Sequence, residues 1–221
     1  MKKITLNKIV EFRYKSEKNQ KGFLKNINKN SESSGGGNYW VRSLSAMSNA
    51  VKLNDHNPIK EKITEILKAN VSGLPKRTKD MYDRNLKILY NYQSFDFSNW
   101  LPKKYEILSK TNTKTILEIN TIPVQITPSQ IFSFDIEDIK SIGAVWFVAR
   151  LNGYRIEELG MFAEALFIYL TNNFGEKHQI NPKYCIVIDV LEKQEVRYVD
   201  LINKKVSKIL DSTLELIKKQ F

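Results

Sequence analysis

The feature that most constrains the fold is an uninterrupted apolar run, Ala144-Val-Trp-Phe-Val148, which is too short to span a bilayer. Such a run is typical of a strand that is buried on both faces. After the Asn152-Gly153 turn, the clearest helical pattern of the chain covers about residues 156–173 and ends before Gly175. We therefore expect a central sheet that is covered by helices.

The remaining segments place helices early in the chain and mix strands with helices later. Apolar residues at helical spacing predict three early helices, and the pattern changes to strands near Lys114. A turn at Asn120-Thr121 joins the first two expected strands. The predicted helices are one that Asn38 caps, with Trp40, Leu44, Met47 and Val51 on its apolar face, one that follows Asn57-Pro58 and ends at Gly73 and Pro75, one over about 77–92, a brief one from Asp135 to Ile142, and one over 206–219. The predicted strands are 115–119, 122–126, 130–134, 184–190 and 196–199. The expected class is α+β, with a central mixed sheet flanked by helices.

We divide the chain into three parts by composition. Residues 1–37 form a basic arm with a Gly-rich linker, residues 38–112 a helical region, and residues 113–221 an α+β sheet domain that forms one compact unit with 38–112. Within the arm, residues 2–14 alternate loosely and indicate a strand that could add to a partner protein. Residues 15–37 are rich in Lys, Asn, Ser and Gly, which predicts a mobile linker with a hinge at Gly35–Gly37.

The arm also carries more than half of the excess positive charge. Nine of its residues are Lys or Arg and three are Glu, in a chain of net charge +11. A basic segment of this kind favours a polyanionic partner. Only seven of the 35 basic residues are Arg, and an AT-rich genome also enriches Lys, so the charge alone is weak evidence for nucleic acid.

The favoured partner is nucleic acid, DNA rather than RNA, held by its phosphates. Lys, Arg and Asn contact the phosphate backbone, whereas direct base recognition depends largely on Arg. Candidate residues lie on the arm and on the polar faces of the first and third helices. They are Lys15, Lys18, Lys21, Lys25, Lys29, Arg42, Asn49, Lys52, Lys76, Arg77, Arg84 and Lys87.

The order helix, three strands, helix, strand over about residues 77–190 resembles the restriction-endonuclease-like core of many DNA-cleaving and DNA-repair proteins. The resemblance implies a strand carboxylate and an acid-x-Lys pair that hold Mg²⁺ and position water. No motif of that family matches, because the strand Ala144–Val148 carries no acid. The residues to test for such a site are Glu118, Asp135, Glu137, Asp138 and Lys140.

Other reactive residues have simpler interpretations. Cys185 lies in an apolar strand and is expected to be a core thiol, and a single cysteine excludes an internal disulfide. His56 and His178 are far apart in the sequence and lack metal-ligand spacing. Glu157 and Glu164 share a helix face, and acids early in a helix mainly complement its N-terminus.

Three hypotheses for function follow. The first is a non-catalytic or accessory nucleic-acid-binding protein that needs no cofactor or metal. The second is a Mg²⁺-dependent nuclease with a degenerate core, and the third is a subunit that docks on a larger assembly through residues 2–14. The start of the chain has no apolar stretch after its lysines, so we expect a cytoplasmic protein without a signal peptide or membrane contact.

Overall fold

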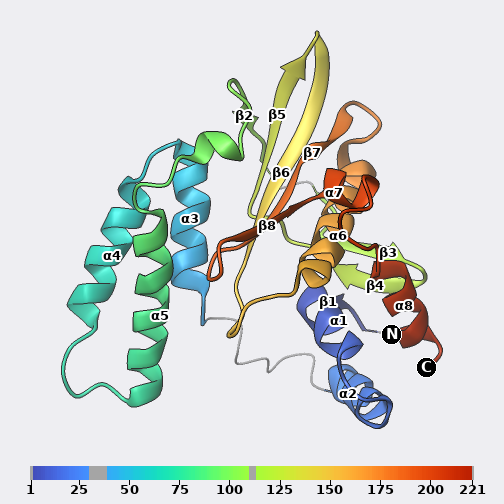
Figure 1. The fold of residues 1–221 in the computed structure, drawn as a ribbon, viewed down its shortest axis with the longest axis horizontal. Helices are drawn as coiled ribbons and strands as arrows, with labels where there is room; N and C mark the ends of the chain where they lie inside the picture. The colour runs from blue at the N-terminus through green and yellow to red at the C-terminus, as the bar shows by residue number, and fades with distance from the viewer. Residues whose placement is uncertain (1, 30–38, 110–112, 221) are drawn as a thin grey trace.

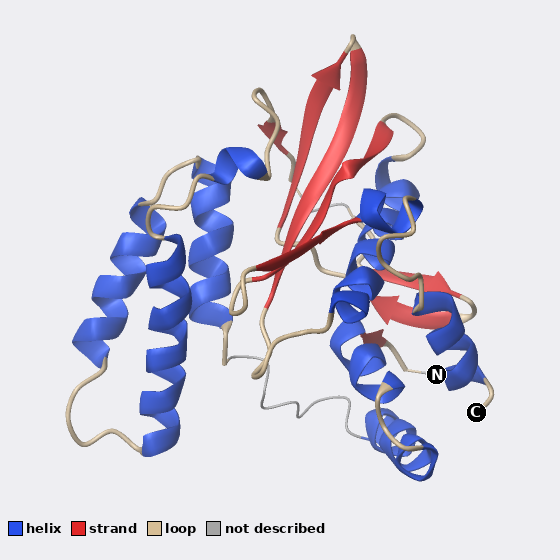
Figure 2. Ribbon diagram, viewed as in Figure 1, coloured by secondary structure: helices blue, strands red, loops and turns tan. Residues whose placement is uncertain are grey.

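The computed structural model describes residues 2–29, 39–109 and 113–220. Helices and strands alternate irregularly along the chain and form the layers shown in Figures 1 and 2. The helices are α1 (Leu6–Arg13), α2 (Glu17–Lys29), α3 (Val41–Leu53), α4 (Asn57–Ala69), α5 (Lys76–Tyr92), α6 (Ile156–Phe174), α7 (Tyr198–Ile202) and α8 (Leu210–Lys218), with a short 3-10 turn at Phe97–Asn99.

The strands form two sheets. They are β1 (Ile4–Thr5), β2 (Glu106–Ile107), β3 (Ile116–Ile119), β4 (Ile122–Gln125), β5 (Gln130–Ile136), β6 (Ile139–Val148), β7 (Gln179–Asp189) and β8 (Gln194–Arg197). The larger sheet has the order β2-β5-β6-β7-β8, and β1-β4-β3 form the smaller one. In the larger sheet only β6 and β7 are parallel, so the sheet is mixed and the α+β class is confirmed.

The unit β6-α6-β7 forms the centre of the molecule. Residues 141–148 of β6 are all buried, and the predicted apolar run Ala144–Val148 lies within them. On one face of the sheet α6 packs in a core that it shares with α1 and α8. On the other face α3, α4 and α5 enclose a second core with aromatic residues such as Trp100 and Phe147. Figure 1 shows the sheet between these two groups of helices.

The three early helices occur where their apolar spacing places them. α3 buries Met47 and Val51, and α4 buries Ile59, Ile63 and Ile66. Pro58 occupies the first turn of α4, where its missing N–H has no helical partner to lose. The strands β3, β4 and β5 and the long helix α6 also agree with the prediction to within a few residues.

The predicted arm is wrong in its secondary structure. Only Ile4–Thr5 form a strand, and they pair with β4 of the same chain rather than with a partner protein. Residues 6–13 form α1, whose Ile9, Val10 and Phe12 are fully buried. Residues 17–29, expected as a mobile linker, form α2. The Gly35–Gly37 hinge and the expected cap Asn38 lie outside the described residues.

Two further segments differ from the prediction. Asp135 to Ile142 is not a helix, because β5 and β6 continue to a tight hairpin turn at Glu137-Asp138, where both residues have positive φ. The expected closing helix 206–219 begins only at Leu210, and α7 precedes it after β8. Within the described ranges, no helix has both the length and the apolar character required to cross a membrane.

Candidate nucleic-acid interface

Three lysines form a stripe along the exposed face of α2. Lys18, Lys21 and Lys25 are separated by three and four residues, so they share one side of the helix. All three side chains are exposed, and none has an ion-pair partner in the part of the chain that the structure describes. We call Lys18, Lys21 and Lys25 the α2 stripe. Lys29, also a candidate, is the last residue of the helix.

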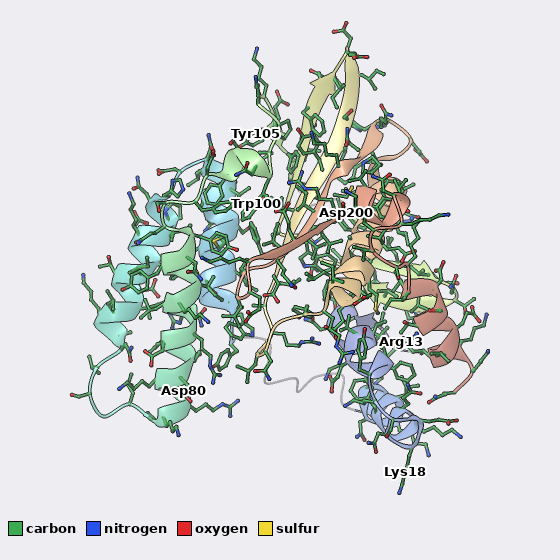
Figure 3. All side chains as sticks on the ribbon, viewed as in Figure 1. Arg13, Lys18, Asp80, Trp100, Tyr105 and Asp200 are labelled. Atoms are coloured by element: carbon green, nitrogen blue, oxygen red, sulfur yellow. The ribbon has the colours of Figure 1, made fainter. Side chains whose placement is uncertain are left out.

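The opposite face of α2 anchors the helix to the body of the protein. Leu24 and Gln20 are buried there. The Gln20 amide donates to the carbonyl oxygen of Phe12 at 3.3 Å and accepts from the Gln220 amide at 2.7 Å. Because α2 is fixed on this side, Lys18 projects outward from a firm support (Figure 3).

The Lys15 side chain makes contacts within the protein. Its ammonium nitrogen lies 3.0 Å from a carboxylate oxygen of Glu11 and 4.7 Å from the centre of the Phe23 ring. These contacts hold the corner between α1 and α2. Lys15 therefore has a structural role that the α2 stripe lacks.

Arg84 on α5 also proves to be a structural residue. Its guanidinium donates to the Tyr39 hydroxyl at 2.5 Å and lies 5.5 Å from the centre of that ring. The buried neighbour Asn85 accepts from the backbone N–H of Ser43 at 2.9 Å. Together these contacts fasten the start of α3 to α5. Lys76, Arg77 and Lys87 remain exposed on the same helix.

Arg42 on α3 has acidic and aromatic partners. It forms an ion pair of 2.6 Å with Glu65 and lies 5.4 Å from the centre of the Tyr82 ring. Lys62 pairs with the same glutamate; its hydrogen bond is the main reason that the pKa of Glu65 is lowered, and the charge of Arg42 adds to the effect. Of the α3 candidates, Asn49 and Lys52 are therefore the exposed ones without such a partner among the described residues.

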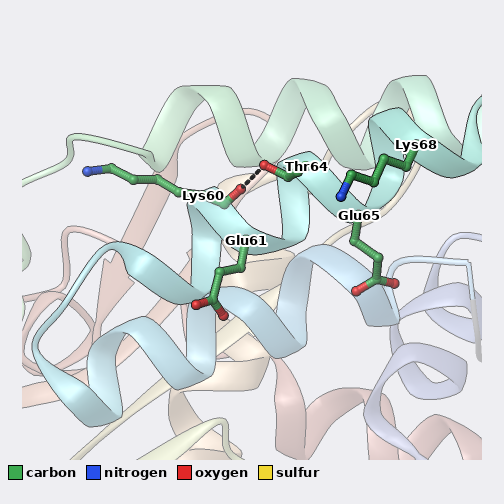
Figure 4. A pocket seen from close by; sticks show the side chains of 5 residues that line it. All are labelled: Lys60, Glu61, Thr64, Glu65 and Lys68. Atoms are coloured by element: carbon green, nitrogen blue, oxygen red, sulfur yellow. Dashed lines mark hydrogen bonds between the residues drawn. The ribbon is translucent and has the colours of Figure 1, made fainter.

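The outer face of α4 contains a shallow hollow of about 470 Å³. Its five lining side chains all come from this one helix, and the only bond among them joins the Thr64 hydroxyl to the Lys60 carbonyl oxygen at 3.1 Å (Figure 4). A binding site needs polar groups that converge from several elements. This hollow is therefore no candidate site.

The structure brings together only part of the set considered for a nuclease. Asp135 on β5 and Lys140 on β6 lie directly opposite each other in the larger sheet, whereas Glu118 lies on β3 of the smaller one. Glu137 and Asp138 form the exposed hairpin turn between β5 and β6, at the top of Figure 1. Among residues 2–29, 39–109 and 113–220, no three His, Cys, Asp or Glu side chains form a group that could hold a metal ion.

The other reactive residues have structural partners. Cys185 is buried, and burial raises the pKa of its thiol far above the ordinary value. His56 contacts the carbonyl oxygen of Phe95 at 2.7 Å and stacks on Phe97. The buried Glu158 binds Arg150 through both of its oxygens and accepts the backbone N–H of Arg155 at 2.6 Å.

Among the described residues, Glu164 is one of two buried acids with a raised pKa; the other is Asp189 at the end of β7. Burial raises the pKa of Glu164, and nearby Asp211 raises it further, while Lys208 and the backbone N–H of Leu210 oppose the shift. One of its carboxylate oxygens has no hydrogen-bond partner among the described atoms. The protonated form is therefore favoured in the folded protein more than in the unfolded chain.

We predict that Glu164→Gln flattens the pH dependence of stability. A raised folded pKa gives stability that is complete below the ordinary value of 4.5 and is lost as the pH rises through the folded pKa. As the pH rises from 4.5 through the folded pKa of Glu164, the free energy of unfolding of the wild type should fall. That of the variant should fall less. Urea unfolding from pH 4 to 8 measures the difference, with Glu157→Gln on the same helix as the control. Parallel curves for wild type and Glu164→Gln would contradict the prediction.

Sequence reasoning missed a groove between α1 and α3. It has a volume of about 660 Å³, and its floor is formed by the last residues of β6. Asn7 and Lys8 of α1 line the groove, as do Trp40, which precedes α3, and Leu44 of α3. The sequence signal for it was the polar alternation Gln125, Thr127, Ser129 at and just after the end of β4, since all three line the groove.

Comparisons with protein-family models, with curated proteins and with solved structures find no match for this chain.

Proposed function

We propose that this protein binds nucleic acid without catalysing a reaction, and that it contacts the phosphate backbone through the α2 stripe. The observation that carries the proposal is the position of the charge. Residues 2–29 contain nine basic and two acidic residues. Residues 57–92 contain eight basic and four acidic residues. Residues 130–175, which include β5, β6 and α6, contain three basic and six acidic residues.

This distribution differs from that of a chain that is evenly enriched in lysine. Genome composition would raise the lysine content of all segments alike, whereas here the centre is acidic and the helices beside it are basic. Figure 1 shows α2 and the start of α5 at the same edge of the molecule. Exposed cations that have no acidic partner keep their full charge for phosphate contacts.

The test is a salt titration of the full chain with labelled double-stranded and single-stranded DNA. Removal of residues 1–37 would be a poor test, because Ile9, Val10 and Phe12 belong to the core and the shortened chain would lose stability. Phosphate contacts predict that log K falls linearly with log salt, by about 0.9 for each duplex phosphate neutralised. Salt-independent or absent binding would refute the proposal.

The same samples with added Mg²⁺ or Mn²⁺ test for nuclease chemistry. Glu118 lies in a different sheet from the neighbouring Asp135 and Lys140, and no three possible metal ligands gather among the described residues, so we expect intact DNA after long incubation. Cleavage that a metal chelator stops would contradict the non-catalytic proposal.

A further inference from the structure

The groove between α1 and α3 lies at a favourable place in the fold. Its floor includes Trp146, Val148 and Ala149, where β6 ends and turns toward α6. Ligands of sheets with parallel strands commonly bind outside the carboxyl ends of those strands, and β6 and β7 are the parallel pair here. A volume of about 660 Å³ is within the range of small-ligand sites.

Aromatic rings line the groove, and Trp40, just before α3, is the accessible one. Trp146 of β6 and Phe162 of α6 are buried in the lining, with exposed fractions of 8% and 1%. Trp146 and Phe162 pack edge to face, with ring centres 5.2 Å apart, so the floor is rigid. Trp40 is only half-buried. Its ring can therefore stack on a planar ligand without leaving the core.

Polar groups face the same groove. The Tyr154 hydroxyl donates to the side-chain oxygen of Asn7 at 2.7 Å, which orients the Asn7 NH₂ group as the remaining donor. The side chains of Gln125 and Thr127 also line the groove and make no hydrogen bond with another described residue. Amide and hydroxyl groups beside aromatic rings match the edge of a nucleobase, which carries both donors and acceptors.

The Lys8 side chain provides a positive charge at the edge of the groove. Lys8 and Glu11 both line the groove, and the Lys8 ammonium lies 3.3 Å from a carboxylate oxygen of Glu11 and 5.4 Å from the centre of the Phe23 ring. Both side chains are more than 40% exposed, so this pair contributes little and a phosphate can replace the carboxylate at small cost. Lys8 belongs to the same basic segment, residues 2–29, as the α2 stripe.

We infer that this groove binds one unpaired base of a nucleic-acid strand, with stacking on Trp40 and hydrogen bonds to Asn7, Gln125 and Thr127. The inference rests on the proposed nucleic-acid function and narrows it to single-stranded or locally opened strands. Lys8 contacts the phosphate of the bound nucleotide, and neighbouring phosphates extend toward the α2 stripe. Aromatic stacking with sequence-tolerant phosphate contacts is the usual mode of single-strand binding.

The experiment compares single-stranded oligothymidylate with duplex DNA, using the full chain and fluorescence anisotropy. Trp40→Leu keeps an apolar side chain but removes the stacking ring, so it should weaken single-strand binding about tenfold and change duplex binding less than twofold. Thr127→Val, at an exposed position, removes only a hydroxyl and should weaken single-strand binding several-fold. Tyr90→Leu, an aromatic residue 45% exposed on α5 and outside the groove, should change neither.

The outcomes separate this inference from the proposed function. Equal affinity for both DNAs, unchanged by Trp40→Leu and Thr127→Val, would overturn the base site and leave phosphate binding intact. If no DNA binds, the proposed function fails, and NMR titration with thymidine monophosphate then tests the groove directly. Shifts confined to Trp40, Gln125 and Thr127 would support a nucleotide site, and no shifts would overturn it. Melting curves show whether Trp40→Leu is folded. If it is not, the effect of Thr127→Val on single-strand binding decides whether the groove binds a base.

Discussion

Asp189→Ala should lower the free energy of unfolding by about 3 to 5 kcal/mol, because it leaves three backbone N–H groups without an acceptor. Asp189 is fully buried at the end of β7. One of its carboxylate oxygens accepts from Tyr154 at 2.9 Å, and the other accepts from Leu191 at 3.0 Å and Glu192 at 3.4 Å. The side chain thus joins the β6–α6 loop to the β7–β8 turn. For a chain of this length, the expected fall in melting temperature is about 10 °C.

A graded series makes this prediction specific. Asp189→Asn keeps one carbonyl oxygen and should fall between the wild type and Asp189→Ala in urea unfolding. Asp135→Ala removes an exposed acid from the β5–β6 hairpin and should change stability by less than about 0.5 kcal/mol. A loss of less than about 1 kcal/mol for Asp189→Ala would show that water replaces the carboxylate as acceptor.

The sequence predicted the elements whose pattern has one dominant period. The apolar run of β6, the long helix α6 and the helices α4 and α5 have such patterns, because each buries a face or both faces in one of the two cores. The Asn120-Thr121 turn was also predicted, and both of its residues have positive φ. Asn tolerates that conformation well, so the turn has a local signal.

The sequence predictions were wrong where residue composition was given more weight than the spacing of the apolar residues. Leu6, Ile9 and Val10 have the spacing of a helix, and they are buried in α1 together with Phe12, yet the looser alternation of residues 2–14 suggested a strand. In α2 the many Lys and Asn residues suggested a linker, although Leu24 and Ile27 pack on the core. At Glu137-Asp138, two acids typical of a helix start stand in a hairpin turn instead. The segment is a strand because residues 130–136 pair with β6 at seven positions.

The candidate interface was predictable in part. The sequence identified basic residues. It could not distinguish those held by partners within the protein, such as Arg42 and Arg84, from those that are exposed without a partner. Their partners Glu65 and Tyr39 lie 23 and 45 residues away in the sequence. The groove depends on contacts of still longer range, since Asn7 and Tyr154 are separated by 147 residues. No local pattern carries such information.

The largest effect on binding is expected from neutralising the α2 stripe. Replacement of Lys18, Lys21 and Lys25 by Gln removes three exposed charges without touching the buried face of α2. If each lysine neutralises one phosphate, the slope of log K against log salt should shrink by about 2.7 for duplex DNA. At about 0.1 M salt the affinity should fall at least a hundredfold. Anisotropy titrations at several salt concentrations give both quantities.

The matched control changes the net charge equally at a different place. Lys103, Lys104 and Lys177 are exposed, and they lie near β2 and at the end of α6, toward the opposite edge of Figure 1 from α2. Their replacement by Gln should reduce the affinity only slightly, through the long-range field, which about 0.1 M salt screens beyond roughly 10 Å. Equal losses for the two triple variants would mean that net charge alone attracts the DNA. In that case α2 would not be the contact surface, and the charge of the whole protein would explain the binding.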